Sequence, residues 1–170
     1  MCNLIALIFI ALYAVNTSAS ECFDNENLAR LSTASQRGTL IYVWSPRMVY
    51  SVQQMLIAAR AAAISGLEFV AVHDSRVPKS ELYSYQSSRV SAPTGSSIKL
   101  EDEDLATPPY LSIADTSQPL CAATLLKHDA LRHFPTAFIV TAQGVHRHSI
   151  VGVMPPAAWH SSIAQRLQQP

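Results

Sequence analysis

The feature that most constrains the fold is a strand, a helix and a second strand that follow one another directly. The run 39–44, Thr-Leu-Ile-Tyr-Val-Trp, is typical of a strand buried on both faces. Ser45 and Pro46 then predict an N-cap and the first position of a helix, which Gly66 can end. The apolar face of this helix is Met48, Val52, Met55, Leu56, Ala59, Ala62 and Ala63. A second apolar strand is predicted at 67–72, parallel to the first and reached by a right-handed crossover.

The C-terminal part of the chain also contains predicted helices and strands, in a different order. Helical spacing predicts a helix over 120–131, and the apolar run 137–140 predicts a buried strand. Residues 142–144, Ala-Gln-Gly, predict a hairpin turn into an alternating strand at 145–153. Two prolines then open a last amphipathic helix within 155–167.

The segment 75–119 between these parts has a different composition. A short polar helix is predicted at 78–89, and 90–119 is rich in Ser, Pro, Thr and Gly. The acidic run 101–104 is interpreted as part of a solvated loop. We therefore expect a long insertion between two structured parts.

Composition excludes two classes of protein. The chain has 170 residues, with 12 Lys and Arg against 12 Asp and Glu, and 14% charged residues. A neutral, sparsely charged surface does not suit nucleic acid, because binding phosphates needs a basic surface. With 49% hydrophobic residues the chain can bury a core, so global disorder is excluded as well.

The first twenty residues have the pattern of a secretory signal. A short apolar run at 4–15 is followed by small and polar residues at 16–20, which predicts cleavage after Ala19 or Ser20. The sequence thus predicts export to a periplasmic or extracellular compartment, with no stable membrane span after cleavage. An uncleaved N-terminal anchor is the alternative, although the apolar run is shorter than a spanning helix needs.

Two cysteines, Cys22 and Cys121, remain after the predicted cleavage. In an oxidising compartment such a pair most often forms one structural disulfide. The sequence alone leaves open whether they pair or whether Cys121 is a free, reactive thiol.

Three local patterns in this order resemble the thioredoxin-like superfamily. The first is a buried strand that ends in Trp44 just before a helix. The second is 131–136, Leu-Arg-His-Phe-Pro-Thr, which is similar to the family's segment with a cis-proline, here Pro135, before a strand. The third is the hairpin with Gly144 and Gly152, followed by the C-terminal helix.

The resemblance covers 39–74 and 120–167. It implies an α/β fold, a three-layer sandwich with a central mixed sheet. The sheet would be built from a βαβ half and a β-hairpin-α half, in a single domain over 21–170 with the insertion at about 75–119.

The chain departs from the family's redox-active members at the start of the first helix. Ser45 and Met48 stand where those members have the two cysteines of Trp-Cys-x-x-Cys. Thiol–disulfide exchange needs a stabilised thiolate and a second, resolving thiol. A serine hydroxyl and a thioether supply neither, so the sequence predicts no dithiol chemistry at this position.

The surface that remains suits binding of another protein or an extended peptide. Free helix N–H groups could receive an anion or a carbonyl, and Arg47 adds a positive charge. In the family, the backbone beside the cis-proline pairs with extended peptide. The candidate binding residues are Trp44, Ser45, Pro46, Arg47, Phe134 and Pro135.

Three other hypotheses stay open. In the first, Ser45 acts only as a helix cap, which stabilises the helix by about 1 kcal/mol. Alternatively the protein exchanges disulfides through Cys121, with or without Cys22. His146 and His148 share one face of the predicted strand and could contribute to a copper or zinc site, but without an evident third ligand no metal or other cofactor is assigned.

Overall fold

The structure is a computed structural model that describes residues 22–81 and 109–168. The strands are β1 (Thr39–Trp44), β2 (Glu68–His73), β3 (Gln118–Pro119), β4 (Thr136–Thr141), β5 (Gly144–Val145) and β6 (Ile150–Val151). The helices are α1 (Asn25–Ala34), α2 (Val49–Ile64), α4 (Pro109–Thr116), α5 (Ala123–Lys127) and α6 (Pro156–Leu167). The predicted signal sequence, the acidic run and most of the helix predicted at 78–89 lie outside the described residues.

The strands form one mixed sheet in the order β3-β2-β1-β4-β5, with β6 also paired to β4. β1 and β2 are parallel, with Thr39 opposite Glu68. β4 is antiparallel to β1, with Thr39 opposite Val140. This is the arrangement that the sequence predicted, a parallel βαβ unit joined to an antiparallel hairpin. The fold is thioredoxin-like.

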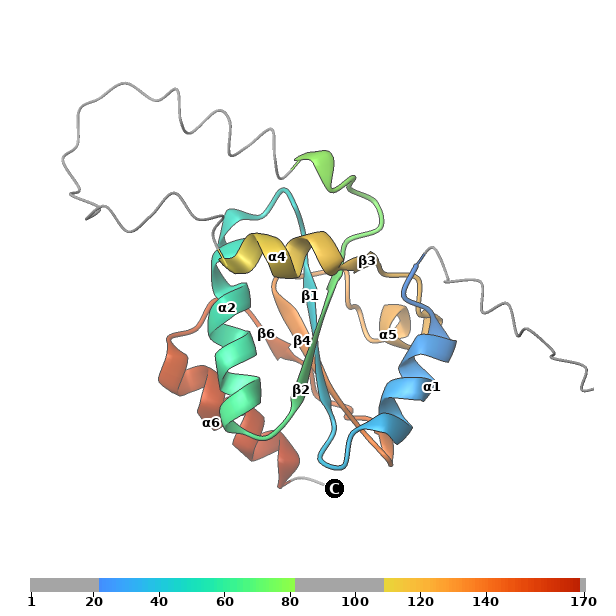
Figure 1. Cartoon of the computed structure of the whole chain (residues 1–170), viewed down its shortest axis with the longest axis vertical. Helices are drawn as coiled ribbons and strands as arrows, with labels where there is room; N and C mark the ends of the chain where they lie inside the picture. The colour runs from blue at the N-terminus through green and yellow to red at the C-terminus, as the bar shows by residue number, and fades with distance from the viewer. Residues whose placement is uncertain (1–21, 82–108, 169–170) are drawn as a thin grey trace, which may run out of the picture.

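Helices cover both faces of the sheet, and β1 contributes to both cores. Figure 1 shows α2, α4 and α6 on one face and α1 and α5 on the other. Leu40, Tyr42 and Trp44 belong to the core beneath the first layer, and Ile41 and Val43 belong to the core beneath the second. The alternation follows from the strand period of two, and it explains why β1 is apolar throughout.

The N-terminal part of the described chain contains a helix that the sequence analysis did not predict. Asp24 caps α1, and its carboxylate accepts hydrogen bonds from the N–H groups of Glu26 (3.0 Å) and Asn27 (2.9 Å). The Asn27 side chain in turn accepts from the Asp24 N–H at 2.9 Å. The spacing of Asp24 and Asn27, which allows this reciprocal capping, was the sequence signal that could have predicted the helix.

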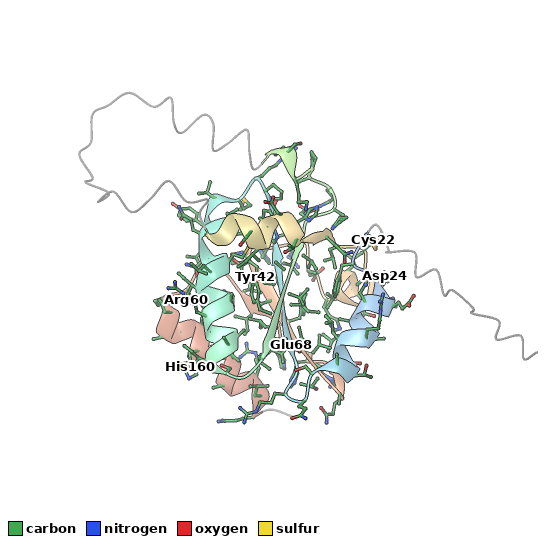
Figure 2. The ribbon with its side chains drawn as sticks, in the orientation of Figure 1. Cys22, Asp24, Tyr42, Arg60, Glu68 and His160 are labelled. Carbon is green, nitrogen blue, oxygen red and sulfur yellow. A yellow bond between two sulfur atoms is a disulfide. The ribbon has the colours of Figure 1, made fainter. Side chains whose placement is uncertain are left out.

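The chain just before α1 is held at the edge of the sheet. Phe23 donates to the Pro119 carbonyl (2.8 Å) and accepts from the Cys121 N–H (2.9 Å). Cys22 and Cys121 are joined by a disulfide, with 5.9 Å between their Cα atoms and a sequence separation of 99. Cys22 and Asp24 are labelled in Figure 2. We call Cys22, Phe23 and Cys121 the N-terminal edge.

Several element boundaries differ from the prediction. α4 and β3 lie in 109–119, which was expected to be loop. The helix predicted over 120–131 is reduced to α5, because Leu120 is instead bonded to the edge of β2 through the His73 carbonyl (2.8 Å), and Asp129 adopts a positive φ of 56° beyond the helix. The strand predicted at 145–153 is divided into β5 and β6.

Across the two described stretches, no helix combines the length and the apolar character that crossing a membrane requires.

Candidate functional site

A surface hollow of about 380 Å³ lies where β1 and β2 end. Open α/β sheets commonly bind ligands at this edge, outside the carboxyl ends of the parallel strands. The residues that line it are Ser45, Arg47, Met48, Asp74, Arg76, Val77 and Phe134. We call this site the hollow. It brings together three of the six predicted binding residues, and the Phe134–Pro135 peptide bond at its side is cis, as the resemblance implied.

The connection from β1 to α2 differs from the predicted helix start. Ser45 is not the N-cap: α2 begins at Val49, and its N-cap residue, Met48, has no side-chain cap hydrogen bond. The Met48 N–H donates to the Ser45 carbonyl (3.0 Å), which closes a turn before the helix. The buried Ser51 hydroxyl accepts from the Ser45 N–H (3.3 Å) and lies 2.6 Å from the Met48 carbonyl, to which it donates. Ser51 therefore holds the turn from inside the helix.

Four of the six predicted binding residues are buried. Trp44 is fully buried, with its ring centroid 5.9 Å from that of His73, and Pro46 and Pro135 are buried as well. Ser45 lines the hollow but is only 2% exposed. Met48 differs from its prediction in the opposite sense. It was expected to pack against the sheet, yet the residue is 48% exposed because the helix begins after it.

The cis-proline side of the hollow presents an unbonded backbone segment. Neither the N–H nor the carbonyl of Phe134 forms a hydrogen bond with a described residue. The Pro135 carbonyl accepts from the Gly152 N–H at 2.9 Å, which holds the chain around Gly152 beside the proline. Val151 and Val153, on either side of that glycine, are exposed. The backbone before the cis-proline therefore keeps one donor and one acceptor that no described residue uses.

Exposed apolar side chains occur at the start of α2 and after β6. Met48, which lines the hollow, and Tyr50 are exposed at the start of α2, and Val153 is exposed in the segment after β6. The side-chain amide oxygen of Gln54, one turn after Tyr50, accepts from the backbone N–H of Met154 (3.2 Å). This bond brings the segment after β6 against α2. The same oxygen accepts from the indole N–H of Trp159 on α6 (2.7 Å). Gln54 therefore links α2 to the segment after β6 and to α6.

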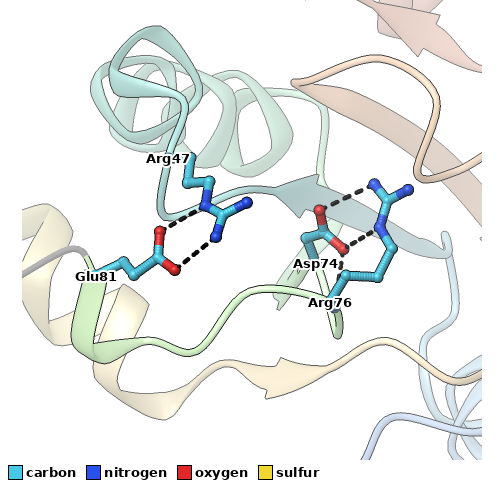
Figure 3. A network of polar contacts seen from close by, with 4 residues as sticks. All are labelled: Arg47, Asp74, Arg76 and Glu81. Atoms are coloured by element: carbon cyan, nitrogen blue, oxygen red, sulfur yellow. Dashed lines mark hydrogen bonds and ion pairs between the residues drawn. The ribbon is translucent and has the colours of Figure 1, made fainter.

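Two ion pairs surround the same hollow (Figure 3). The Arg47 guanidinium donates twice to the Glu81 carboxylate, at 2.6 and 2.8 Å. The Arg76 guanidinium donates twice to Asp74, at 2.8 and 3.0 Å, and once to the Leu131 carbonyl at 2.9 Å. Both pairs have the two-pronged geometry that guanidinium and carboxylate groups favour.

Asp74 stays ionised although its side chain is almost fully buried. Burial raises the pKa of this carboxyl group, but hydrogen bonds from the Arg76 side chain and backbone oppose burial. The positive charges of Arg76 and Arg47 act in the same direction, so the pKa lies below its ordinary value. Asp74 therefore neutralises charge within the hollow and is not a proton donor at neutral pH.

His73, at the end of β2, is neutral at physiological pH. Burial lowers its pKa to about 4, and the nearby Lys79 ammonium group acts in the same direction, while Asp74 and a hydrogen bond involving Ser117 oppose them. Its Nδ1 lies 3.2 Å from the Ser117 hydroxyl. The ring does not line the hollow, so it is not placed to activate Ser45 as a nucleophile.

The two cysteines of the described chain lie away from the hollow. Both cysteines of the described chain are joined to each other at the N-terminal edge, and neither lines the hollow. Ser45 and Met48 supply a hydroxyl and a thioether at the helix start, as the sequence predicted. The arrangement offers contacts to a bound segment but no thiol.

Within the described residues, no group of three or more His, Cys, Asp or Glu side chains is placed to hold a metal ion. His146 lies in the segment between β5 and β6, where its N–H donates to the Ile139 carbonyl at 2.9 Å, and His148 is exposed in the same segment.

Comparison with known proteins identifies a likeness to solved structures. No family model matches the chain, and no curated protein matches it. Among solved structures, it is similar to a secreted Mycobacterium tuberculosis disulfide oxidoreductase described as homologous to Escherichia coli DsbE. The identity is 12%, the match covers 84% of this chain and 87% of that chain, and the TM-score is 0.45.

Proposed function

We propose that this chain is an exported, non-catalytic thioredoxin-like protein that binds an extended segment of another envelope or secreted protein in the hollow. The observation that carries the proposal is the unbonded Phe134 backbone beside the cis Phe134–Pro135 bond, next to exposed Met48. An extended segment can pair with such a backbone by β-augmentation, with its side chains against Met48 and Phe134, which line the hollow. The signal pattern and the disulfide support export.

The test is selection of a phage-displayed random nonapeptide library on the immobilised whole chain. Selected peptides are then measured against Met48→Asp, which places a charge in the hollow. The matched control is Ile64→Asp, because Ile64 ends the same helix and is 74% exposed. We expect Met48→Asp to weaken binding at least tenfold and Ile64→Asp to leave it unchanged, since only the first change charges an apolar contact surface.

Two results would contradict the proposal. One is a selection that enriches no peptide over an uncoated surface. The other is a set of peptides that bind Met48→Asp and the unaltered chain equally well, because these peptides would occupy another surface.

A redox function is the second candidate, and the exposure of the disulfide supports it. Cys22 and Cys121 are only half-buried, so an attacking thiolate could reach their disulfide. Titration with glutathione, followed by alkylation and intact mass, separates the two functions. A structural bridge has a reduction potential below about −300 mV, whereas a catalytic one titrates near the potential of its compartment.

A further inference from the structure

We propose that the segment bound in the hollow carries an acidic side chain, whose carboxylate replaces Glu81 on the Arg47 guanidinium. This inference rests on the proposed function and specifies the chemistry of the partner. In the structure, the Glu81 carboxylate accepts hydrogen bonds from the Arg47 guanidinium in the way that a partner's Asp or Glu would (Figure 3). Glu81 is therefore an internal competitor of the partner.

The exposed charge around the hollow is predominantly positive. The Arg47 and Arg76 side chains are 63% and 61% exposed, whereas the Glu81 side chain is 33% exposed and the Asp74 side chain only 4%. A partner thus meets two guanidinium groups, while the carboxylate of Asp74 lies beneath them. Such a surface favours a negatively charged partner and disfavours a positively charged one.

Both guanidinium groups retain donors for a further acceptor. Arg47 uses Nε and Nη2 on Glu81, and Arg76 uses Nε and Nη2 on Asp74 and the Leu131 carbonyl. Neither Nη1 donates to a described residue. A guanidinium carries five N–H donors in a fixed plane, so a second carboxylate can approach before Glu81 leaves.

The third cation near the hollow is already engaged. The Lys79 ammonium group donates to the carbonyls of Asp115 (2.8 Å) and Ser117 (2.9 Å). Selectivity for an acidic side chain therefore depends on the two arginines. Because Met48, Val77 and Phe134 also line the hollow, the favoured segment combines apolar residues with one acidic residue.

The experiment starts from the peptides selected above. We expect Asp or Glu to be enriched at one position, and replacing that residue by its amide to weaken binding about threefold to fivefold, as for an exposed ion pair. The difference between the acidic peptide and its amide should shrink in 0.5 M salt, because screening reduces the Coulomb attraction. In Arg47→Gln, the difference between the two peptides should fall to the part that Arg76 alone retains, and an undiminished difference would overturn the inference.

The decisive variant is Glu81→Gln. Removing the competitor frees Arg47, so the acidic peptide should bind about threefold more tightly while its amide counterpart is unaffected. The matched control is Glu26→Gln on α1, which makes the same change of charge in an exposed pair with Arg30 (4.0 Å) on the other face of the sheet. This control should change neither affinity.

The outcomes separate this inference from the proposed function. Peptides that bind at the hollow without preference for an acidic residue, or equal effects of Glu81→Gln and Glu26→Gln, would overturn the inference and leave the proposed function standing. Failure to select any peptide at the hollow would overturn both.

Discussion

A thioredoxin-like redox protein has its cysteines at the start of the first helix. In this chain the two are separate: the cysteines lie at the N-terminal edge, and the start of the corresponding helix, α2, lies at the hollow. At the edge, two sulfur atoms join residues separated by 99 positions, beside a strand of only two residues. At the hollow, the start of α2 presents a serine, a thioether and an arginine. Under the proposed function, the disulfide stabilises the fold and the start of α2 provides only non-covalent contacts.

His73 contacts both regions, so their independence is a question that experiment can answer. Its carbonyl accepts from the Leu120 N–H (2.8 Å), next to Cys121, and its ring packs against Trp44 beneath the hollow. Altering either region while measuring stability and peptide binding separately therefore shows how far the division of roles extends.

The largest expected effect on stability follows from removing the disulfide. The double variant Cys22→Ser/Cys121→Ser should lose about 4 kcal/mol of unfolding free energy, because the bridge restricts a long loop in the unfolded chain. Urea unfolding measures the loss. At a temperature where circular dichroism shows the variant folded, the selected peptides should bind as before. Loss of binding by the folded variant would contradict the separation of the two regions.

The second effect is a pH dependence centred on His73. The folded-state pKa of about 4 lies below the ordinary value of 6.5, so the unfolded chain takes up a proton first as the pH falls. The unfolding free energy should therefore decrease between about pH 6.5 and pH 4, by roughly 3 kcal/mol. Asp74 acts in a lower range, because its pKa is below 3.8 in the folded protein. In His73→Gln, urea unfolding should show a flatter profile, and an unchanged slope would refute the assignment.

A smaller loss is expected from Ser51→Ala. The substitution removes the hydroxyl that accepts from the buried Ser45 N–H, which should reduce the unfolding free energy by about 1–2 kcal/mol. The control is Ser161→Ala on α6, where the exposed hydroxyl donates only to the Ala157 carbonyl (3.0 Å). Thermal unfolding should separate the two variants, and amide exchange at Met48 should accelerate only in Ser51→Ala. Equal effects would show that helix propensity, not the turn, is responsible.

The smallest effect on stability is expected at the rim of the hollow. Arg47→Gln and Glu81→Gln should leave the midpoint of thermal unfolding unchanged within error, because exposed ion pairs contribute little to folding. The same variants are expected to change the preference for acidic peptides. A clear fall in the midpoint would mean that the pair holds the fold and is not reserved for a partner.

The sequence predicted those parts of the fold that local periodicity encodes. The β1 strand is fully buried along its length because each of its residues belongs to an apolar run with a core on both sides. The parallel pairing of β1 with β2 follows from the helix between them. The absence of cysteine at the start of α2 was likewise evident from the residues at 45–48 alone.

The sequence was less informative about the candidate site. Met48 fitted the periodicity of the helix and was therefore assigned to its buried face, but the turn that Ser51 holds through Ser45 and Met48 delays the start of the helix to Val49. Trp44 was predicted to contact a partner because it precedes the helix, yet the core of α2 and α6 encloses it. A single residue at the boundary of an element decides which side chains reach the surface.

The sequence by itself determined the order of β1, α2 and β2, the later order of β4 and α6, and the lack of cysteine at the start of α2. Only the tertiary structure decided that Cys22 meets Cys121, that Glu81 meets Arg47, and that Asp74 is covered by Arg76. The physical reason is that periodicity reports the local environment of each residue. Contacts between distant residues depend on how the layers pack, and packing is a property of the whole chain.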